Sequence, residues 1–223
     1  MAKGKLIVIE GLDGCGKNTH TKILCSKLKN LGKSIHKISF PDYSQPSSSL
    51  VKMYLNSEFG DSPSLVNAYA ASSFFAVDRY ANYIKFWKNR HDSGQIILAN
   101  RYSTSNAAYN LAKLPEKKWD FYLEWLEDYE YNKLELPKPD VVIYLDMPIE
   151  ASQKFISKRY KGKEYKKDLH EKNIKYLLQC RKTALYTAKK LNWIIIPCSI
   201  NNKVKKINDI NEEIITSIKD VVF

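Results

Sequence analysis

A glycine-rich loop near the start of the chain has the residue types needed to bind a polyphosphate. Three glycines, at positions 11, 14 and 16, precede Lys17 in the segment GLDGCGKNT. Glycines let the backbone curl so that several amides point inward, and a helix that begins after the loop adds its positive end. A lysine at this position reaches the β- and γ-phosphates. We expect ATP to bind along the whole loop, at Gly11, Leu12, Asp13, Gly14, Cys15, Gly16, Lys17, Asn18 and Thr19.

The loop departs from the usual pattern at Asn18, where serine or threonine normally gives its hydroxyl to Mg²⁺. An amide oxygen can ligate a hard cation, so Asn18 either holds the Mg²⁺ that accompanies ATP or points away and leaves water in its place. The histidines and cysteines show no metal-ligand spacing and no CxxC pair. A metal site built on them and a disulfide scaffold are therefore not expected.

Candidate acceptor-binding residues follow two of the expected strands. Pro41 and Tyr43 lie in SFPDYSQPSS, after the strand expected at residues 34–39. Arg101 directly follows the strand expected at residues 95–99, where a guanidinium can clamp an acceptor phosphate with two hydrogen bonds. Asn106 and Tyr109 come one helical turn apart. They either present an amide to a base edge and a ring to a sugar, or act as capping and packing residues.

A helix-like run, SSFFAVDRYANY, places Phe75 and Arg79 four positions apart on one face. Either Phe75 belongs to the core and Arg79 forms a salt bridge with Asp78 or a neighbour, or both face a ligand. Further along, residues 158–168 read KRYKGKEYKKD, with six basic and two acidic residues. This stretch is either a solvated loop or a lid that brings cations to a bound triphosphate.

The elements that must position these residues alternate along the chain. Short apolar runs at residues 5–10, 34–39, 95–99, 141–145 and 193–197 predict strands, and longer segments with helical spacing separate them. Runs such as VVIYL are apolar on both faces, as strands covered by helices on each side are. We expect an α/β fold, a three-layer α/β/α sandwich around a five-stranded parallel sheet, with residues 1–223 forming a single domain. Ligands bind beyond the carboxyl ends of such strands.

Composition and charge limit the classes of partner that we expect the chain to bind. The net charge of +12 suits either nucleic acid or nucleotides, but no nucleic-acid-binding motif accompanies it, so nucleic acid is not the expected partner. No apolar run approaches the roughly 20 residues of a membrane span, and the short apolar start lacks the features of a signal peptide. We expect a soluble cytoplasmic protein, which agrees with scattered cysteines.

Together these motifs resemble the thymidylate kinase family, and the resemblance covers nearly the whole chain. Four segments carry it: GLDGCGKNT, FPDY, FFAVDR and NRYSTSNAAY, the last being similar to the family's DRY-S-AY segment. The resemblance implies a P-loop nucleoside-monophosphate kinase that transfers the γ-phosphoryl group of ATP, with Mg²⁺, to dTMP. It also implies a homodimer, and the aromatic-rich stretch at residues 69–87 is either its surface or part of the core.

The resemblance further implies a role for each acceptor-site residue. Asp13 would contact the 3′-hydroxyl of dTMP, Tyr43 and Arg101 would hold its phosphate, and Pro41 would belong to the pocket wall. Phe75 would stack on thymine, Arg79 and Asn106 would read the base edge, and Tyr109 would fill the space of a ribose 2′-hydroxyl. Lys17, Arg101 and the lid residue Arg159 would be catalytic. The remaining lid candidates and the residues after the lid are Lys161, Lys163, Lys166, Lys167, Asp168, Glu171 and Tyr176.

One departure from the family concerns Asn100, which stands where the DRY segment has its aspartate. Together with Asn18 it leaves the metal site poorer in anionic and hydroxyl ligands. The protein is then either a working enzyme whose metal is held mainly by ATP and water, or a weakened or non-catalytic nucleotide-binding relative. A kinase for another nucleoside monophosphate or a deoxynucleoside is the alternative within the same class.

Overall fold

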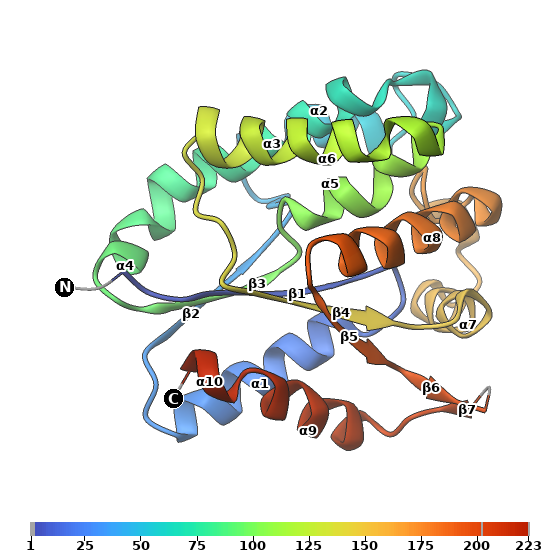
Figure 1. Ribbon diagram of the computed structural model, residues 1–223. Helices are drawn as coiled ribbons and strands as arrows, with labels where there is room; N and C mark the ends of the chain where they lie inside the picture. Colours follow the sequence, from blue (N-terminus) through green and yellow to red (C-terminus); the bar gives the residue numbers. More distant parts are fainter. Residues whose placement is uncertain (1–2, 202, 223) are drawn as a thin grey trace.

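A parallel five-stranded sheet forms the centre of the protein (Figure 1). The computed structural model describes residues 3–201 and 203–222. The strands are β1 (Leu6–Gly11), β2 (Ile35–Ser39), β3 (Ile96–Asn100), β4 (Val141–Asp146) and β5 (Ile194–Pro197), in the order β2-β3-β1-β4-β5. The predicted sheet is confirmed, with boundaries within about one residue of those expected. A short antiparallel ribbon, β6 (Ser199–Ile200) and β7 (Lys203–Val204), was not predicted.

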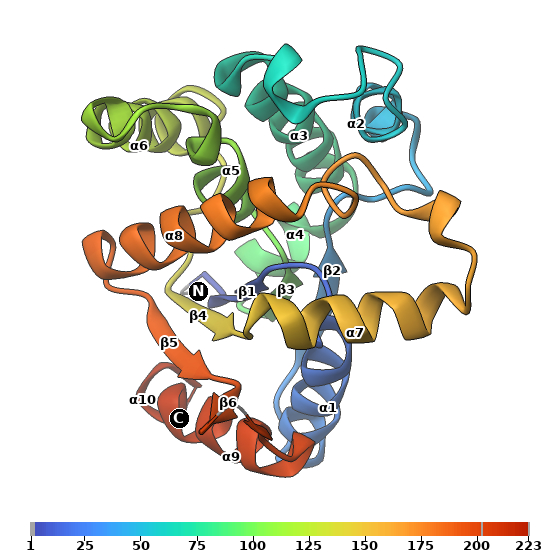
Figure 2. The same ribbon diagram turned by 90° about the vertical axis from the view of Figure 1, so that its right-hand side faces the viewer.

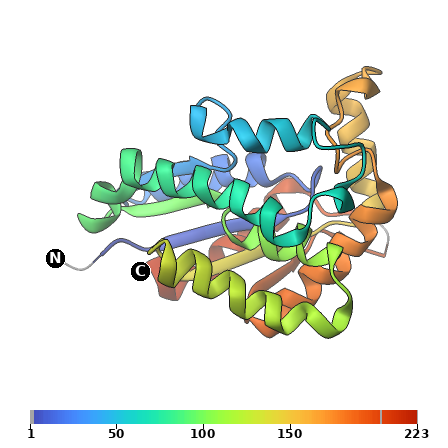
Figure 3. The same ribbon diagram turned by 90° about the horizontal axis from the view of Figure 1, so that it is seen from above.

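Helices of very different lengths connect and follow the strands. They are α1 (Lys17–Asn30), α2 (Ser49–Leu55), α3 (Ala68–Asn82), α4 (Lys88–Asp92), α5 (Thr104–Tyr109), α6 (Trp119–Glu127), α7 (Ile149–Tyr160), α8 (Ile174–Lys190), α9 (Ile207–Ser217) and α10 (Lys219–Val222). Two π-helical turns, Tyr83–Trp87 and Asp128–Lys133, continue α3 and α6. Seen from above, α3 and α6 run lengthwise over the sheet (Figure 3).

The helices cover both faces of the sheet and so form the predicted three layers (Figure 1). Side chains of β1 alternate between two cores because successive residues of a strand point to opposite faces. Leu6 and Val8 pack with the layer of α3, α5, α6 and α8, whereas Ile7 and Ile9 pack with α1, α9 and α10. All four are fully buried. This two-sided burial explains why the strand sequences are apolar throughout.

The carboxyl end of the sheet is crossed by α7, and the segment between α7 and α8 passes from there toward α2 (Figure 2). The Leu169 amide donates to the Leu55 carbonyl oxygen at 3.1 Å and ties this segment to α2. Asn67 and Asn173 cap α3 and α8, because each side chain accepts a hydrogen bond from an amide in the first turn. Elements from both halves of the chain therefore surround the strand ends.

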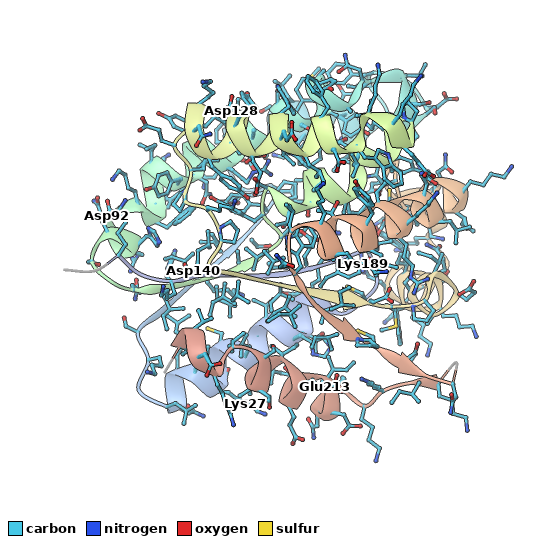
Figure 4. The ribbon with its side chains drawn as sticks, in the orientation of Figure 1. Lys27, Asp92, Asp128, Asp140, Lys189 and Glu213 are labelled. Carbon is cyan, nitrogen blue, oxygen red and sulfur yellow. The ribbon has the colours of Figure 1, made fainter. Side chains whose placement is uncertain are left out.

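Charged side chains cover the outside of both helical layers (Figure 4). Lys27 on α1 and Lys189 on α8 are exposed on the two sides of the sheet. Within residues 3–201 and 203–222, no helix combines the length and apolar character needed to cross a bilayer.

Candidate active site

The loop after β1 curls tightly over the start of α1. Gly14 and Gly16 have φ angles of 80° and 90°, in the left-handed region that favours glycine. A Cβ atom on Gly14 would lie 2.4 Å from the Ser152 carbonyl oxygen, so α7 packs directly on the loop backbone. Because α1 begins at Lys17, the positive end of its dipole faces the loop. The loop has the expected geometry, and its binding of ATP stays a prediction.

The candidate ATP site is a cavity that opens at this loop. Seven of the nine predicted loop residues line it, from Asp13 to Thr19. Gly11 and Leu12 do not line it, and the Leu12 carbonyl oxygen accepts a hydrogen bond from Lys17 Nζ at 2.8 Å. The cavity wall also includes residues of the β7–α9 region, which the sequence did not reveal: Val204, Lys205, Ile207 and Ile210.

A second cavity lies beside the first and is the candidate acceptor site. It brings together all eight residues that the sequence predicted for dTMP: Asp13, Pro41, Tyr43, Phe75, Arg79, Arg101, Asn106 and Tyr109. Asp13, Phe40 and Arg101 line both cavities. The two charged residues of this set, Asp13 and Arg101, therefore mark the place where a donor phosphate and an acceptor phosphate would meet.

An ion-pair network occupies this junction. Arg101 Nη2 donates to Asp13 Oδ1 at 2.6 Å, and Tyr109 Oη donates to Asp13 Oδ2 at 2.8 Å. Although burial opposes ionisation, the charges of Arg101 and then Lys17 hold the pKa of the Asp13 carboxyl well below its usual range. Arg101 has a φ of 68°. A non-glycine residue in this region is strained, and such strain is common at binding sites.

Glu10, an acidic residue that the sequence did not predict for the site, supports this network. Its side chain is fully buried. It accepts hydrogen bonds from the Gly11 amide at 2.9 Å and from the Thr104 and Ser105 hydroxyls at 2.8 Å each, and Arg101 Nη1 lies 3.4 Å away. With this many partners the Glu10 carboxylate is a support for Arg101 and α5 rather than an open ligand.

At the other end of the acceptor cavity, Arg79 forms a buried salt bridge whose partner the sequence did not identify. The partner is Glu130, which binds Arg79 Nε at 2.8 Å and also contacts Nη2. Asp78 instead accepts from the Asp42 amide and the Ser47 hydroxyl. Phe75 is half-buried and meets the Tyr54 ring edge-on. Arg79 is thus salt-bridged, though to Glu130 rather than to Asp78, and it also lines the cavity, so its contact with a ligand stays a prediction.

The lid candidate Arg159 lies in the last turn of α7 and lines the ATP cavity. Its Nη1 donates to Glu171 Oε1 at 3.1 Å, and the Tyr160 hydroxyl donates to the same carboxylate at 2.6 Å. Lys161, Lys163 and Lys166 are exposed. Tyr176 has a structural contact, because its hydroxyl donates to the Tyr109 carbonyl oxygen at 2.6 Å.

Asp168, the last residue of the lid segment, and the unpredicted His170 also line the acceptor cavity. Burial, and next the charge of Asp13, raise the pKa of Asp168 to about 7. His170 stacks on Tyr109 with ring centroids 5.2 Å apart, and its Nε2 lies 2.8 Å from the Tyr54 hydroxyl oxygen. Burial lowers the pKa of His170 to about 3, so its imidazole is neutral at physiological pH.

Comparison with known proteins decides the family. A family profile described as thymidylate kinase matches residues 9–213. The chain belongs to the thymidylate kinase family. It is 34% identical over 148 residues to a thymidylate kinase of Mycobacterium tuberculosis, covering 66% of this chain and 68% of that protein. A thymidylate kinase of Danio rerio is 26% identical over 96% of this chain and 92% of its own.

The fold comparison agrees. A solved structure of thymidylate kinase from Candida albicans superposes with a TM-score of 0.71 at 25% identity and covers 99% of this chain and 93% of its own. The predicted P-loop nucleoside-monophosphate kinase fold is thereby confirmed. The glycine loop and the NRYSTSNAAY segment both contribute to the ATP cavity, which Asn18 and Asn100 line.

The fit of this cavity to Mg²⁺ depends on these two amides. Among the described residues no group of three or more His, Cys, Asp or Glu side chains could hold a metal ion. The Asn100 side-chain oxygen, however, is buried and finds no hydrogen-bond partner in the described part of the chain. A hard oxygen without a partner suits Mg²⁺ or its bound water. The residues therefore fit a metal that arrives with ATP and keeps most of its phosphate and water ligands.

Proposed function

We propose that this protein transfers the γ-phosphoryl group of ATP to dTMP and yields dTDP and ADP. The observation that carries the proposal is the shared boundary of the two cavities. Asp13 and Arg101 line both, so a triphosphate on the loop and a monophosphate in the acceptor cavity would approach each other there. Residues 1–223 would act as one kinase domain, with residues 158–168 as its lid.

The reaction asks for alignment and charge neutralisation rather than covalent catalysis. The acceptor phosphate is itself the nucleophile, so no side chain has to remove a proton from it. Lys17 would neutralise charge on the transferred group, Arg101 would hold the acceptor phosphate, and Arg159 would approach from α7. Lys17 is buried, and this burial, and next the charge of Arg101, lower the pKa of its ammonium group. A cation in such a poorly solvated position would act strongly on a phosphate.

Mg²⁺ would be held by ATP, by water and by the amide oxygens of Asn100 and Asn18. When bound, it neutralises phosphate charge and helps to orient the transferred group. The protein contributes the dry, positively charged surroundings. Arg101 donates to Asp13 and is supported by Glu10, so its guanidinium is positioned before any ligand arrives.

Recognition of dTMP would use the far part of the acceptor cavity. Phe75 would stack on the base, Arg79 and Asn106 would meet its edge, and Tyr43 would reach the phosphate. Tyr109 would exclude a ribose 2′-hydroxyl, and the stacked His170 ring keeps Tyr109 in place. The cavity would then select a pyrimidine deoxynucleotide.

We further propose a cytoplasmic homodimer. All four cysteines are free thiols, as expected in a reducing compartment. The outer side of α3 and its π-helical continuation expose apolar side chains, with Val77 at 40%, Tyr80 at 43% and Ile84 at 50% exposure. An exposed apolar stripe of this kind suits a second copy. A monomeric mass in solution would remove this part of the proposal.

The function is tested by ADP release with ATP and Mg²⁺, comparing dTMP with dUMP, dCMP, dGMP, UMP and thymidine. We expect dTMP to have the highest kcat/KM. Preference for another acceptor would reassign the substrate, and binding of both nucleotides without ADP release would indicate a non-catalytic relative.

A further inference from the structure

Glu130 is a fully buried carboxylate, and the partners of its side chain are two residues that line the acceptor cavity. It binds Arg79 through Nε and Nη2, and it accepts from Asn106 Nδ2 at 3.0 Å. Arg79 and Asn106 are themselves buried, with 1% and 2% exposure. Glu130 lies in the π-helical turn Asp128–Lys133. Such turns are rare and frequently occur at functional sites.

The carboxylate fixes the direction of the Asn106 amide. Asn106 Nδ2 donates to Glu130 and, at 3.2 Å, to the Ser72 carbonyl oxygen. An ionised carboxylate and a backbone carbonyl accept hydrogen bonds and cannot donate them. Only the amino group of Asn106 can therefore face them, and Oδ1 must point the other way. There it accepts from Asn110 Nδ2 at 3.1 Å.

The orientation of the Asn106 amide in turn fixes the orientation of the Asn110 amide. Because its Nδ2 donates to Asn106, Asn110 turns its carbonyl oxygen away from Asn106. Asn110 is 1% exposed and lines the acceptor cavity. Its Oδ1 is buried without a hydrogen-bond partner among the described residues. A buried acceptor left unpaired is unfavourable, so this oxygen would gain a partner from a ligand that donates an N–H group beside Asn110.

We propose that Glu130 sets the hydrogen-bonding polarity of the acceptor cavity and thereby its choice of base. Glu130, Asn106 and Asn110 form a directed chain that ends in an acceptor, whereas Arg79 offers only donors. A base with a carbonyl beside a ring N–H, as in thymine or uracil, matches this arrangement. Cytosine presents an amino donor and an unprotonated ring nitrogen and does not match. The inference rests on the proposed function and makes Glu130 a positioning residue for it.

The test compares Glu130→Gln with the wild type and with Glu127→Gln, a matched control one turn earlier whose carboxylate pairs with Lys138 at the surface. A glutamine can donate as well as accept, so Asn106 is no longer held in one direction. Dissociation constants for dTMP and dCMP are measured by calorimetry, beside kcat/KM for both. Asn110→Ala is the second variant, since it removes the end of the chain and leaves the Arg79–Glu130 pair intact.

We expect the wild type and Glu127→Gln to bind dTMP roughly 10- to 100-fold more tightly than dCMP. In Glu130→Gln and Asn110→Ala this ratio should fall by about tenfold or more. A general loss of stability would weaken both ligands together and leave the ratio unchanged. If Glu130→Gln does not fold, the ratio of Asn110→Ala decides.

The outcomes separate the two proposals. A wild-type preference for dTMP in binding, with an unchanged ratio in the folded variants, overturns the inference and leaves the proposed function intact. A wild type that selects dTMP in binding but releases no ADP overturns the proposed function, and the binding ratios of the variants still decide the inference. A wild type that binds dCMP as tightly as dTMP overturns the inference.

Discussion

Replacing Arg101 with methionine should weaken both the fold and the reaction. Arg101 is 14% exposed and lies against the carboxylates of Asp13 and Glu10. Breaking a buried ion pair costs about 3–5 kcal/mol. Because Asp13 keeps Tyr109 and Glu10 keeps its hydroxyl and amide donors, we expect about 3 kcal/mol. For a chain of 223 residues this corresponds to a fall in Tm of about 6–12 °C.

The expected loss of activity is larger, because Arg101 would act on the phosphates directly. Removing an arginine of this kind should lower kcat/KM for dTMP by about 10³-fold. Activity is measured by ADP release and stability by thermal unfolding monitored by circular dichroism. Arg90→Met, at an exposed position of α4, is the matched control and should change neither.

A double variant separates the two effects of Arg101→Met. Adding Asp13→Asn removes one of the carboxylates that the arginine neutralised, so Asp13→Asn/Arg101→Met should be more stable than Arg101→Met alone, with no recovery of activity. The reasoning is refuted if Arg101→Met keeps more than about a tenth of the wild-type kcat/KM, because that loss of activity is far smaller than the loss expected for a residue that clamps the phosphate. It is also refuted if the double variant is the less stable of the two.

Three further predictions follow from the same network. Asn100→Asp should lower the Mg²⁺ concentration for half-maximal activity by about tenfold, with little change in kcat at saturating Mg²⁺; a large rise in kcat would mean that the native amide limits catalysis. Folding raises the pKa of Asp168 to about 7, so the stability that this carboxyl contributes is complete below about pH 4 and is lost as pH rises through 7. The free energy of unfolding falls by up to about 4 kcal/mol over this range. Urea unfolding should therefore show that the free energy of unfolding of Asp168→Asn increases relative to that of the wild type between pH 5 and pH 8. An equal difference between the two proteins at both pH values would contradict this. Tyr109→Phe should lower kcat/KM by about tenfold through the lost hydrogen bond to Asp13, whereas Tyr109→Ala should admit UMP; rejection of UMP by Tyr109→Ala would show that the ring does not exclude ribose.

Local patterns predicted the sheet and the phosphate loop. The apolar runs of β1 and β4 are distinctive because both of their faces are buried, and a glycine loop between such a strand and a helix has few other uses. Arg101 could be placed beside the candidate site for a similar reason, since it directly follows a parallel strand and ligands of such folds bind beyond the carboxyl ends of the strands.

Contacts between distant segments could not be predicted in this way. Glu130 is 51 positions from Arg79 and lies in DYEYNK, which has the composition of a solvated helix end. His170 and Asp168 reach the acceptor cavity only because the segment after α7 is tied to α2. The wall of the ATP cavity at Val204 and Ile207 depends on the ribbon β6–β7. Its two strands have two residues each and are too short to show an alternating hydrophobic pattern in the sequence.

The most direct test of the account follows the γ-phosphoryl group itself. ATP labelled in its γ-phosphate is incubated with the protein, Mg²⁺ and dTMP, and the labelled products are separated. The account predicts that the label appears in dTDP and that its appearance depends on dTMP. Label found only in inorganic phosphate, or no transfer under conditions in which both nucleotides bind, would contradict it.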